Sequence, residues 1–260
     1  MSLPDLPFHW FFASIEEVKT DPEELGRVKI RILNAQDFDE VSTDELLYAQ
    51  ISMPGHYASY QKVGASPTGL EIGTKCWGFF MDGKRKQTPV IVGTIHTIPG
   101  RKAENHSVHD LARGKQTLDT KNTLEEGKQG KVKEPESSYG AKYYENKTFT
   151  TSSGHVIEID DTPGATRIHV YHKSGTYIEI NDNGRTVLKN VDDYYEINVK
   201  DKKVLVKGDY TLEIDGDLEE YITGDLKRKV KGDQIVTVSN NFVMIANSAT
   251  FTINGQEINF

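Results

Sequence analysis

The chain has 260 residues, of which 36% are hydrophobic and 22 are glycine, and its formal net charge is −8. This apolar share is low for a compact globular protein, so extended or repetitive parts are expected. Nucleic acid is excluded as a general partner, because neutralising its phosphates needs an excess of Lys and Arg. The one cysteine, Cys76, excludes an intrachain disulfide and any multi-cysteine metal site. Its apolar surroundings predict a small core residue.

The first twenty residues do not have the pattern of a signal peptide. The stretch "MSLPDLPFHWFFASIEEVKT" lacks a basic start and has only a brief aromatic cluster. No later stretch approaches the roughly 18 consecutive apolar residues of a membrane-spanning helix. We therefore expect synthesis in the cytoplasm of the cell that makes this protein.

Residues 1–100 are predicted to form a small β domain. In "RVKIRIL", Val28, Ile30 and Ile32 alternate with basic residues, as a half-buried strand requires. Further strands are predicted in "WFFASIEEV", "LLYAQISM", "TKCWGFFM" and "PVIVGTIHTI", the last three ending at Pro-Gly or Asp-Gly pairs. About five short strands favour a barrel, and the five-stranded OB-fold is the natural candidate.

Residues 101–147 have a different composition. They hold ten basic and eight acidic residues with only scattered aliphatic ones. Such a segment cannot bury enough surface to offset its ordering entropy, so it is predicted to be a linker or a strap laid on other chains.

Residues 148–260 are predicted to consist of strands and turns. Strands in "HVIEIDDTPGATRIHVYHKSGTYIEINDNGRTVLKN" are separated by the turn formers "DDTPGA", "HKSG" and "NDNG". An octapeptide repeat follows over about residues 199–247, with a Gly-Asp pair recurring every eight residues. The repeat positions form a row of predicted corners: Gly208, Gly216, Gly224, Gly232 and Asn240.

Each octad returns the same positions to the same face of a strand, because eight is a multiple of the strand period of two. A single ribbon of this kind has nothing of its own to pack against, so its partners must be other chains. Three copies wound together would bury the apolar rows on a shared axis, with glycine supplying unusual backbone angles at each corner. The predicted trimer core is Val206, Tyr210, Leu212, Ile214, Leu218, Ile222, Leu226, Val230, Val236 and Val238.

Several stretches together resemble the central spike, or tail lysozyme, of contractile-tailed phage baseplates. They are "LGRVKIRIL", "ASPTGLEIGTKCWGFFMDGKRKQTPVIVGTI", the strand-rich stretch quoted above, and the octads. The carboxy half is also similar to the valine-glycine repeat spike of type VI secretion. The resemblance implies an OB-fold, a trimeric triple-stranded β-helix, and a needle that pierces the host outer membrane when a sheath contracts. It also implies docking of the OB-fold on a separate trimeric hub protein.

One departure from that family concerns catalysis. Well-known phage members carry a lysozyme domain between the OB-fold and the β-helix, whereas residues 101–147 are far too few for one. We therefore expect a structural spike with no catalytic residue. A spike of a type VI-like or other contractile secretion system is the alternative. A β-helical polysaccharide-degrading enzyme is the less favoured one, because the octads offer no converging carboxylates.

No metal or cofactor site is predicted. His169 and His172 are three residues apart, which places them on opposite faces of a strand. The stretch "EINDNG" resembles the start of a calcium loop but lacks the later acidic residue, so a tight turn is the better interpretation.

The carboxy end, residues 239–260, contains Glu257 as its only charged side chain. Two interpretations remain open: a neutral tip that meets the membrane or seats a small capping protein, and a well-packed final rung.

Overall fold

The computed structural model describes residues 9–33, 41–58, 60, 63–66, 69–95, 132–142 and 145–245. These residues contain ten β-strands and two short 3-10 turns, η1 (Thr43–Glu45) and η2 (Gly83–Arg85). The chain divides into two units, residues 1–211 and 212–260. None of the described residues lies in a helix that could cross a membrane.

The first unit begins with a closed barrel of five strands. They are β1 (His9–Glu17), β2 (Val28–Ile32), β3 (Tyr48–Ile51), β4 (Lys75–Phe80) and β5 (Pro89–Ile95). The order around the barrel is β1-β2-β3-β5-β4, and β3 pairs with β5 in parallel while every other pair is antiparallel. The predicted five-stranded barrel is confirmed.

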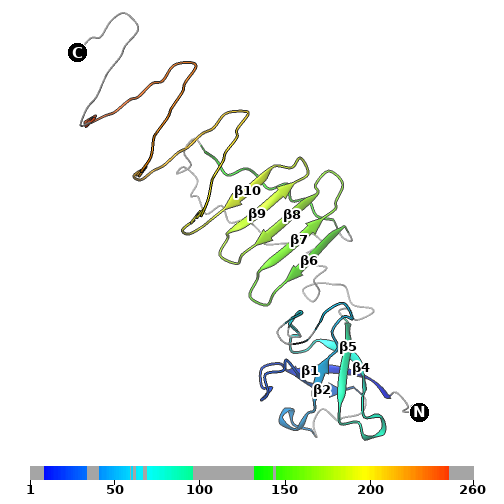
Figure 1. Cartoon of the computed structure of the whole chain (residues 1–260). Helices are drawn as coiled ribbons and strands as arrows, with labels where there is room; N and C mark the ends of the chain where they lie inside the picture. Colours follow the sequence, from blue (N-terminus) through cyan, green and yellow to red (C-terminus); the bar gives the residue numbers. More distant parts are fainter. Residues whose placement is uncertain are drawn as a thin grey trace, which may run out of the picture. The chain divides into compact units, whose positions relative to one another are not determined.

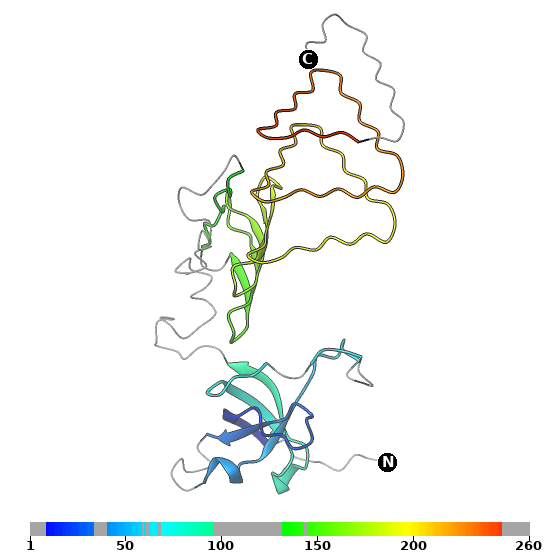
Figure 2. The same ribbon diagram turned by 90° about the vertical axis from the view of Figure 1, so that its left-hand side faces the viewer.

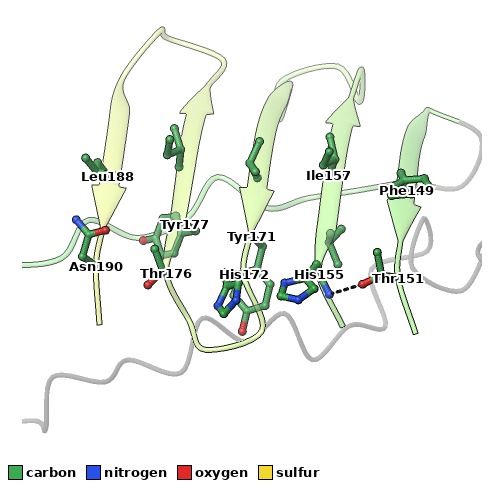
Figure 3. A pocket seen from close by; sticks show the side chains of 13 residues that line it. Phe149, Thr151, His155, Ile157, Tyr171, His172, Thr176, Tyr177, Leu188 and Asn190 are labelled. Atoms are coloured by element: carbon green, nitrogen blue, oxygen red, sulfur yellow. Dashed lines mark hydrogen bonds between the residues drawn. The ribbon is translucent and has the colours of Figure 1, made fainter. Parts of the chain in front are cut away.

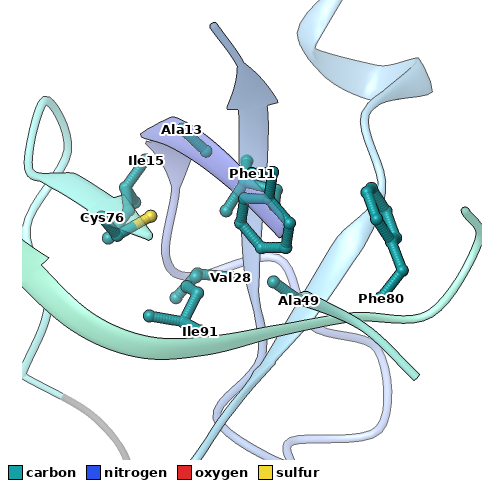
Figure 4. Close-up of a cluster of buried hydrophobic side chains, with 9 residues drawn as sticks. Phe11, Ala13, Ile15, Val28, Ala49, Cys76, Phe80 and Ile91 are labelled. Atoms are coloured by element: carbon teal, nitrogen blue, oxygen red, sulfur yellow. The ribbon is translucent and has the colours of Figure 1, made fainter. Parts of the chain in front are cut away.

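Alternate residues of β1 and β4 fill the barrel. Phe11, Ala13 and Ile15 point inward from β1, and Cys76 and Phe80 from β4 (Figure 4). Burial raises the pKa of the Cys76 thiol to about 11, so Cys76 is the inert core residue that the sequence predicts.

Strand β2 differs from the prediction, because it is buried on both faces. Lys29 and Arg31 were expected on a solvated side, yet their side chains lie under the segment before β3. Lys29 Nζ donates to the carbonyls of Thr43 and Asp44 at 3.2 and 2.9 Å, and Arg31 Nη1 donates to the carbonyl of Val41 at 2.8 Å. Alternation could not reveal this, because the burying loop is remote from β2 in sequence.

The second part of the first unit is an antiparallel sheet with five strands in chain order. Its strands are β6 (Asn146–Thr150), β7 (Val156–Asp160), β8 (Arg167–Tyr171), β9 (Tyr177–Asn181) and β10 (Thr186–Lys189). Tight turns join them, and Gly164 (φ 78°) and Gly184 (φ 76°) adopt the left-handed backbone that favours glycine. "NDNG" is thus part of the β9–β10 turn.

Residues 132–142 run across one face of this sheet, and we call them the strap (Figure 1). The sequence predicts a linker or a strap laid on other chains over residues 101–147. The described part of that segment instead contacts its own chain: Ser137 Oγ donates to Glu179 Oε2 at 2.6 Å, and Lys142 N donates to Thr162 Oγ1 at 3.0 Å. The domain boundaries themselves stay predictions.

Residues 190–245 form no helix, strand or bridge. The chain is extended between bends, which fall at 191–192, 199–200 and 207–208 in the first unit. In the second unit they fall at 215–216, 223–224, 231–232 and 239–240 (Figure 2). Every predicted corner residue therefore lies in a bend, and the interval of eight begins one repeat before the predicted start of the octads.

The prediction that the octad glycines supply unusual backbone angles is wrong for the single chain. None of Gly208, Gly216, Gly224 and Gly232 has a φ in the left-handed region, so the bends use backbone angles open to other residues. A Cβ added at any of the four would meet no atom of the chain within 4 Å. Within one chain, nothing at these positions requires glycine.

Candidate assembly surface

The sheet β6–β10 has one apolar face and one polar face. Two rows of directly paired residues form the apolar face: Phe149, Ile157, Val170, Ile178 and Leu188 in one, and Lys147, Ile159, Ile168, Ile180 and Thr186 in the other. The apolar members of these rows are 37–63% exposed. An exposed apolar area of this extent marks an interaction surface.

This apolar face is hollowed toward one end of the strands. A depression of about 480 Å³ is lined by the row from Phe149 to Leu188 and by residues at the strand ends (Figure 3). Among these, the rings of His155 and His172 lie 4.4 Å apart, centroid to centroid. The Nδ1 of each accepts a backbone N–H, from Lys173 and Ser174 respectively. Both Nδ1 atoms are thus already engaged by backbone of the same chain.

The opposite face is polar, and the strap buries it. Arg167 Nη2 donates to Glu158 Oε2 at 2.5 Å, and its Nη1 donates to Glu179 Oε2 at 3.2 Å. The ring of Tyr139, from the strap, stacks on the guanidinium of Arg167 at 4.5 Å. Period-two alternation places these side chains on one face and the isoleucines on the other.

Burial and the neighbouring side chains have opposite effects on the pKa of Glu158. Burial raises the pKa of this carboxyl, while the ring of His169, the charge of Arg167 and the amide of Asn146 lower it. The neighbours prevail, so the pKa of Glu158 lies below its ordinary value. The group is therefore a buried carboxylate at neutral pH.

The two histidines considered in the sequence are not brought together. His169 is buried on the strap face, 3.8 Å from Glu158, whereas His172 lies in the β8–β9 turn. Among the described residues, no group of three or more His, Cys, Asp or Glu side chains is arranged to hold a metal ion.

The residues of the predicted trimer core are all solvent-exposed in the single chain. The row two residues before each corner is 43–51% exposed: Val206, Ile214, Ile222, Val230 and Val238. The other predicted core residues are 60–71% exposed: Tyr210, Leu212, Leu218, Leu226 and Val236. Sequence reasoning missed the strap contacts and the whole apolar face of the sheet. The alternation in "HVIEID" and "TYIEIN" was the available signal.

The chain matches a known family over part of the barrel and part of the sheet. A family model described as the Gp5 N-terminal OB domain matches residues 34–163, half of the chain. The chain belongs to the Gp5 family of phage baseplate central spike proteins. It is accordingly a virion protein of the baseplate, and the predicted OB-fold and resemblance to the phage spike are confirmed.

Two curated relatives are similar to this chain over different lengths. Protein Gp5 of Vibrio phage KVP40 is 29% identical over 267 residues, which take in 80% of this chain and 63% of that protein. The pre-baseplate central spike protein Gp5 of Enterobacteria phage T4 is 47% identical over 77 residues, 30% of this chain and 13% of that protein. The chain thus spans less than two thirds of the length of either relative.

Proposed function

We propose that this chain is the cell-puncturing needle of a contractile baseplate and works as a homotrimer. Its barrel docks on a separate trimeric hub protein, and its carboxy half winds with two other copies into a triple-stranded β-helix. Contraction of the sheath then drives the needle through the host outer membrane. In that assembly, the predicted core residues pack on the shared axis and the predicted corner residues lie at the bends.

The apolar face of the sheet β6–β10 carries this proposal. Eight apolar side chains in two continuous rows face solvent, while the polar face of the same sheet is buried. A sheet that buries its charges and exposes its isoleucines gains stability when other copies cover the isoleucines. Three copies related by a rotation axis close around such a face and leave none of it exposed.

The octads support the same assembly. Residues 190–245 have no strand ladder of their own, so backbone N–H and C=O groups along this segment can pair with neighbouring chains. Winding three copies together pairs these groups and leaves no exposed sheet edge along the needle. The free space around each octad glycine is then where another chain passes.

We further propose that this chain cleaves no peptidoglycan. Its barrel ends at Ile95 and its second sheet begins at Asn146, which leaves too few residues between them for a lysozyme domain. The alignment with the Vibrio phage relative extends over 267 residues, more than this chain contains, so that relative has residues without a counterpart here. Puncture by force, without cleavage of peptidoglycan, is then the role of this chain.

The mass of the purified full chain in solution tests the assembly. We expect a value near three times 29.2 kDa, and a monomer would overturn the proposal. An assay on purified peptidoglycan tests the lack of lysozyme activity, with a phage lysozyme as the positive control.

The tip and the hub are tested separately. Residues 246–260 lie outside the described residues, so the capping protein predicted for the carboxy end stays a prediction. Truncation after residue 247 should prevent cap binding or infectivity, while the solution mass should still correspond to three of the shortened chains. Docking on the hub is tested by mixing this purified chain with the baseplate hub protein. A stable complex is the expected result.

A further inference from the structure

The strap ties the start of the sheet segment to its end. Glu134, near the start of the strap, forms a 2.8 Å ion pair with Lys189, the last residue of β10. Glu134 also accepts a hydrogen bond from the hydroxyl of Tyr177 in β9 at 2.9 Å. The chain that enters at residue 133 and the chain that leaves at residue 190 are therefore held side by side, although the whole sheet lies between them in sequence.

The strap then continues across the polar face toward the other edge. Ser137 Oγ bridges Glu179 of β9 and Arg167 of β8, at 2.6 and 3.0 Å. Further along, the backbone N–H of Lys142 donates to Thr162 Oγ1 in the β7–β8 turn. The strap thus contacts β10, β9, β8 and the turn that follows β7, in the reverse of their order in the chain.

These contacts are sheltered from water. The side chains of Arg167 and Glu179 are 2% and 3% exposed, and those of Lys189 and Glu134 are 11% and 12% exposed. Burial of this kind makes loss of one partner costly, because the other charge is left in a poorly solvated place. Exposed ion pairs of the same chain, such as Lys202 with Glu196, have no such shelter.

The order of the strands gives the strap a mechanical consequence. Because β6 and β10 are opposite edges of a sheet built in chain order, force entering at β6 and leaving after β10 would peel strands off one at a time. With the strap in place, force entering at residue 133 meets the ion pair between Glu134 and Lys189 first. It passes to residue 190 without loading the edge of β6.

We propose that the strap is a mechanical clamp that transmits axial or torsional force from the linker directly to the octads and keeps the sheet out of the line of force. The inference rests on the proposed function, since a driven needle is what would load this segment. The clamp differs from a general stabiliser of the sheet, because it predicts resistance that depends on where the force is applied.

Single-molecule pulling of the full chain tests the clamp, in a Cys76→Ala background. In the first geometry, handles are attached at Lys133→Cys and Lys200→Cys, so that the strap carries the force. In the second, they are attached at Lys142→Cys and Lys200→Cys, so that the force enters beyond the strap. The clamp is weakened by the double variant Glu134→Gln with Ser137→Ala, which leaves every residue of the sheet unchanged.

In the first geometry, the double variant should rupture on the order of 10-fold faster at a given force, as loss of a hydrogen bond to a charged group implies. In the second geometry, its rupture rate should stay near that of the parent. Lys173→Gln, at an exposed lysine in the β8–β9 turn, is the matched control and should change neither rate.

Two results would overturn the clamp. Equal acceleration in both geometries would make the strap a general stabiliser, and no acceleration in either would show that it carries no force. Neither result bears on the trimer, which the solution mass of the same variant measures separately.

Discussion

Arg167 and Glu158 form an ion pair of 2.5 Å in which neither side chain is more than 2% exposed. This pair lies under the strap, while the neighbouring residues Ile157 and Ile168 face outward on the other side of the same strands. An antiparallel sheet with one solvated face usually buries its apolar side. Within a single chain, this sheet does the reverse.

Replacing Arg167 by methionine should destabilise the sheet strongly. Arg167→Met keeps most of the side-chain volume but leaves Glu158 and Glu179 buried without their cation. We expect a loss of about 3–5 kcal/mol in the free energy of opening of β7 and β8, the usual cost of breaking a buried pair. Hydrogen exchange of the amides of β7 and β8 measures it.

The control for that variant is Lys202→Ala, which removes an exposed ion pair with Glu196. Its effect on the same amides should be much smaller, because surface ion pairs contribute little to stability. A comparable loss in both variants would contradict the view that burial makes the pair at Arg167 important.

The stability of the sheet should fall on acidification. The pKa of Glu158 is lower in the folded chain than in the unfolded one, because its interactions with His169, Arg167 and Asn146 outweigh the effect of burial. The stability from this group is therefore complete above the unfolded pKa, near 4.5, and is lost as pH falls toward the folded pKa. Hydrogen exchange of β7 in a series of buffers below that pH measures the loss. A rise in protection on acidification would contradict the assignment.

A charge on the apolar face should prevent assembly without unfolding the chain. Ile168→Asp places a carboxylate at a position that is 49% exposed in the single chain and, in the proposed trimer, covered by other copies. We expect a monomer by solution mass, with the barrel still folded by circular dichroism. Leu25→Asp, at a similarly exposed residue of the barrel, is the control and should leave the trimer intact. A trimeric Ile168→Asp would exclude this face from the interface.

Replacing an octad glycine by alanine should change the stability of the trimer more than that of the single chain. In one chain, Gly216 has an ordinary φ and open space around its missing Cβ, so Gly216→Ala should be neutral or slightly stabilising by about 0.4–1 kcal/mol. If three chains pack at this corner, the added methyl group costs about 1–3 kcal/mol in the assembly. Thermal melting of the trimer distinguishes the two outcomes, and an unchanged or raised midpoint would remove the packing role of the glycines.

Gly78, inside the barrel, has no space for a side chain, unlike the octad glycines. A Cβ there would lie 1.9 Å from the carbonyl oxygen of Val90 and 2.9 Å from the ring of Phe11. Since the first contact is with backbone, Gly78→Ala should unfold the barrel or displace β5. Alkylation of Cys76 measures this, because the buried thiol should be protected in the parent and become reactive in the variant. Protection of Cys76 in the variant would show that the barrel accommodates the methyl group.

Local patterns were sufficient for much of the fold. The alternation of Val28, Ile30 and Ile32 and the Pro-Gly and Asp-Gly stops predict the barrel strands, because strand period and turn chemistry act over a few residues. The same locality explains the error at Lys29 and Arg31. Their burial depends on a loop ten or more residues away, which no local period encodes.

The sequence by itself determined the strands other than β6, the interval of eight and the rows that each octad returns to one face, since all of these are periodic along the chain. Only the tertiary structure decided which face of the sheet β6–β10 is buried. The strap, through Ser137 and Tyr139, covers the charges of Glu158, Arg167 and Glu179 and leaves the isoleucines outside. Alternation gives two faces but not their partners, because a partner is a segment that approaches from elsewhere in the chain or from another copy.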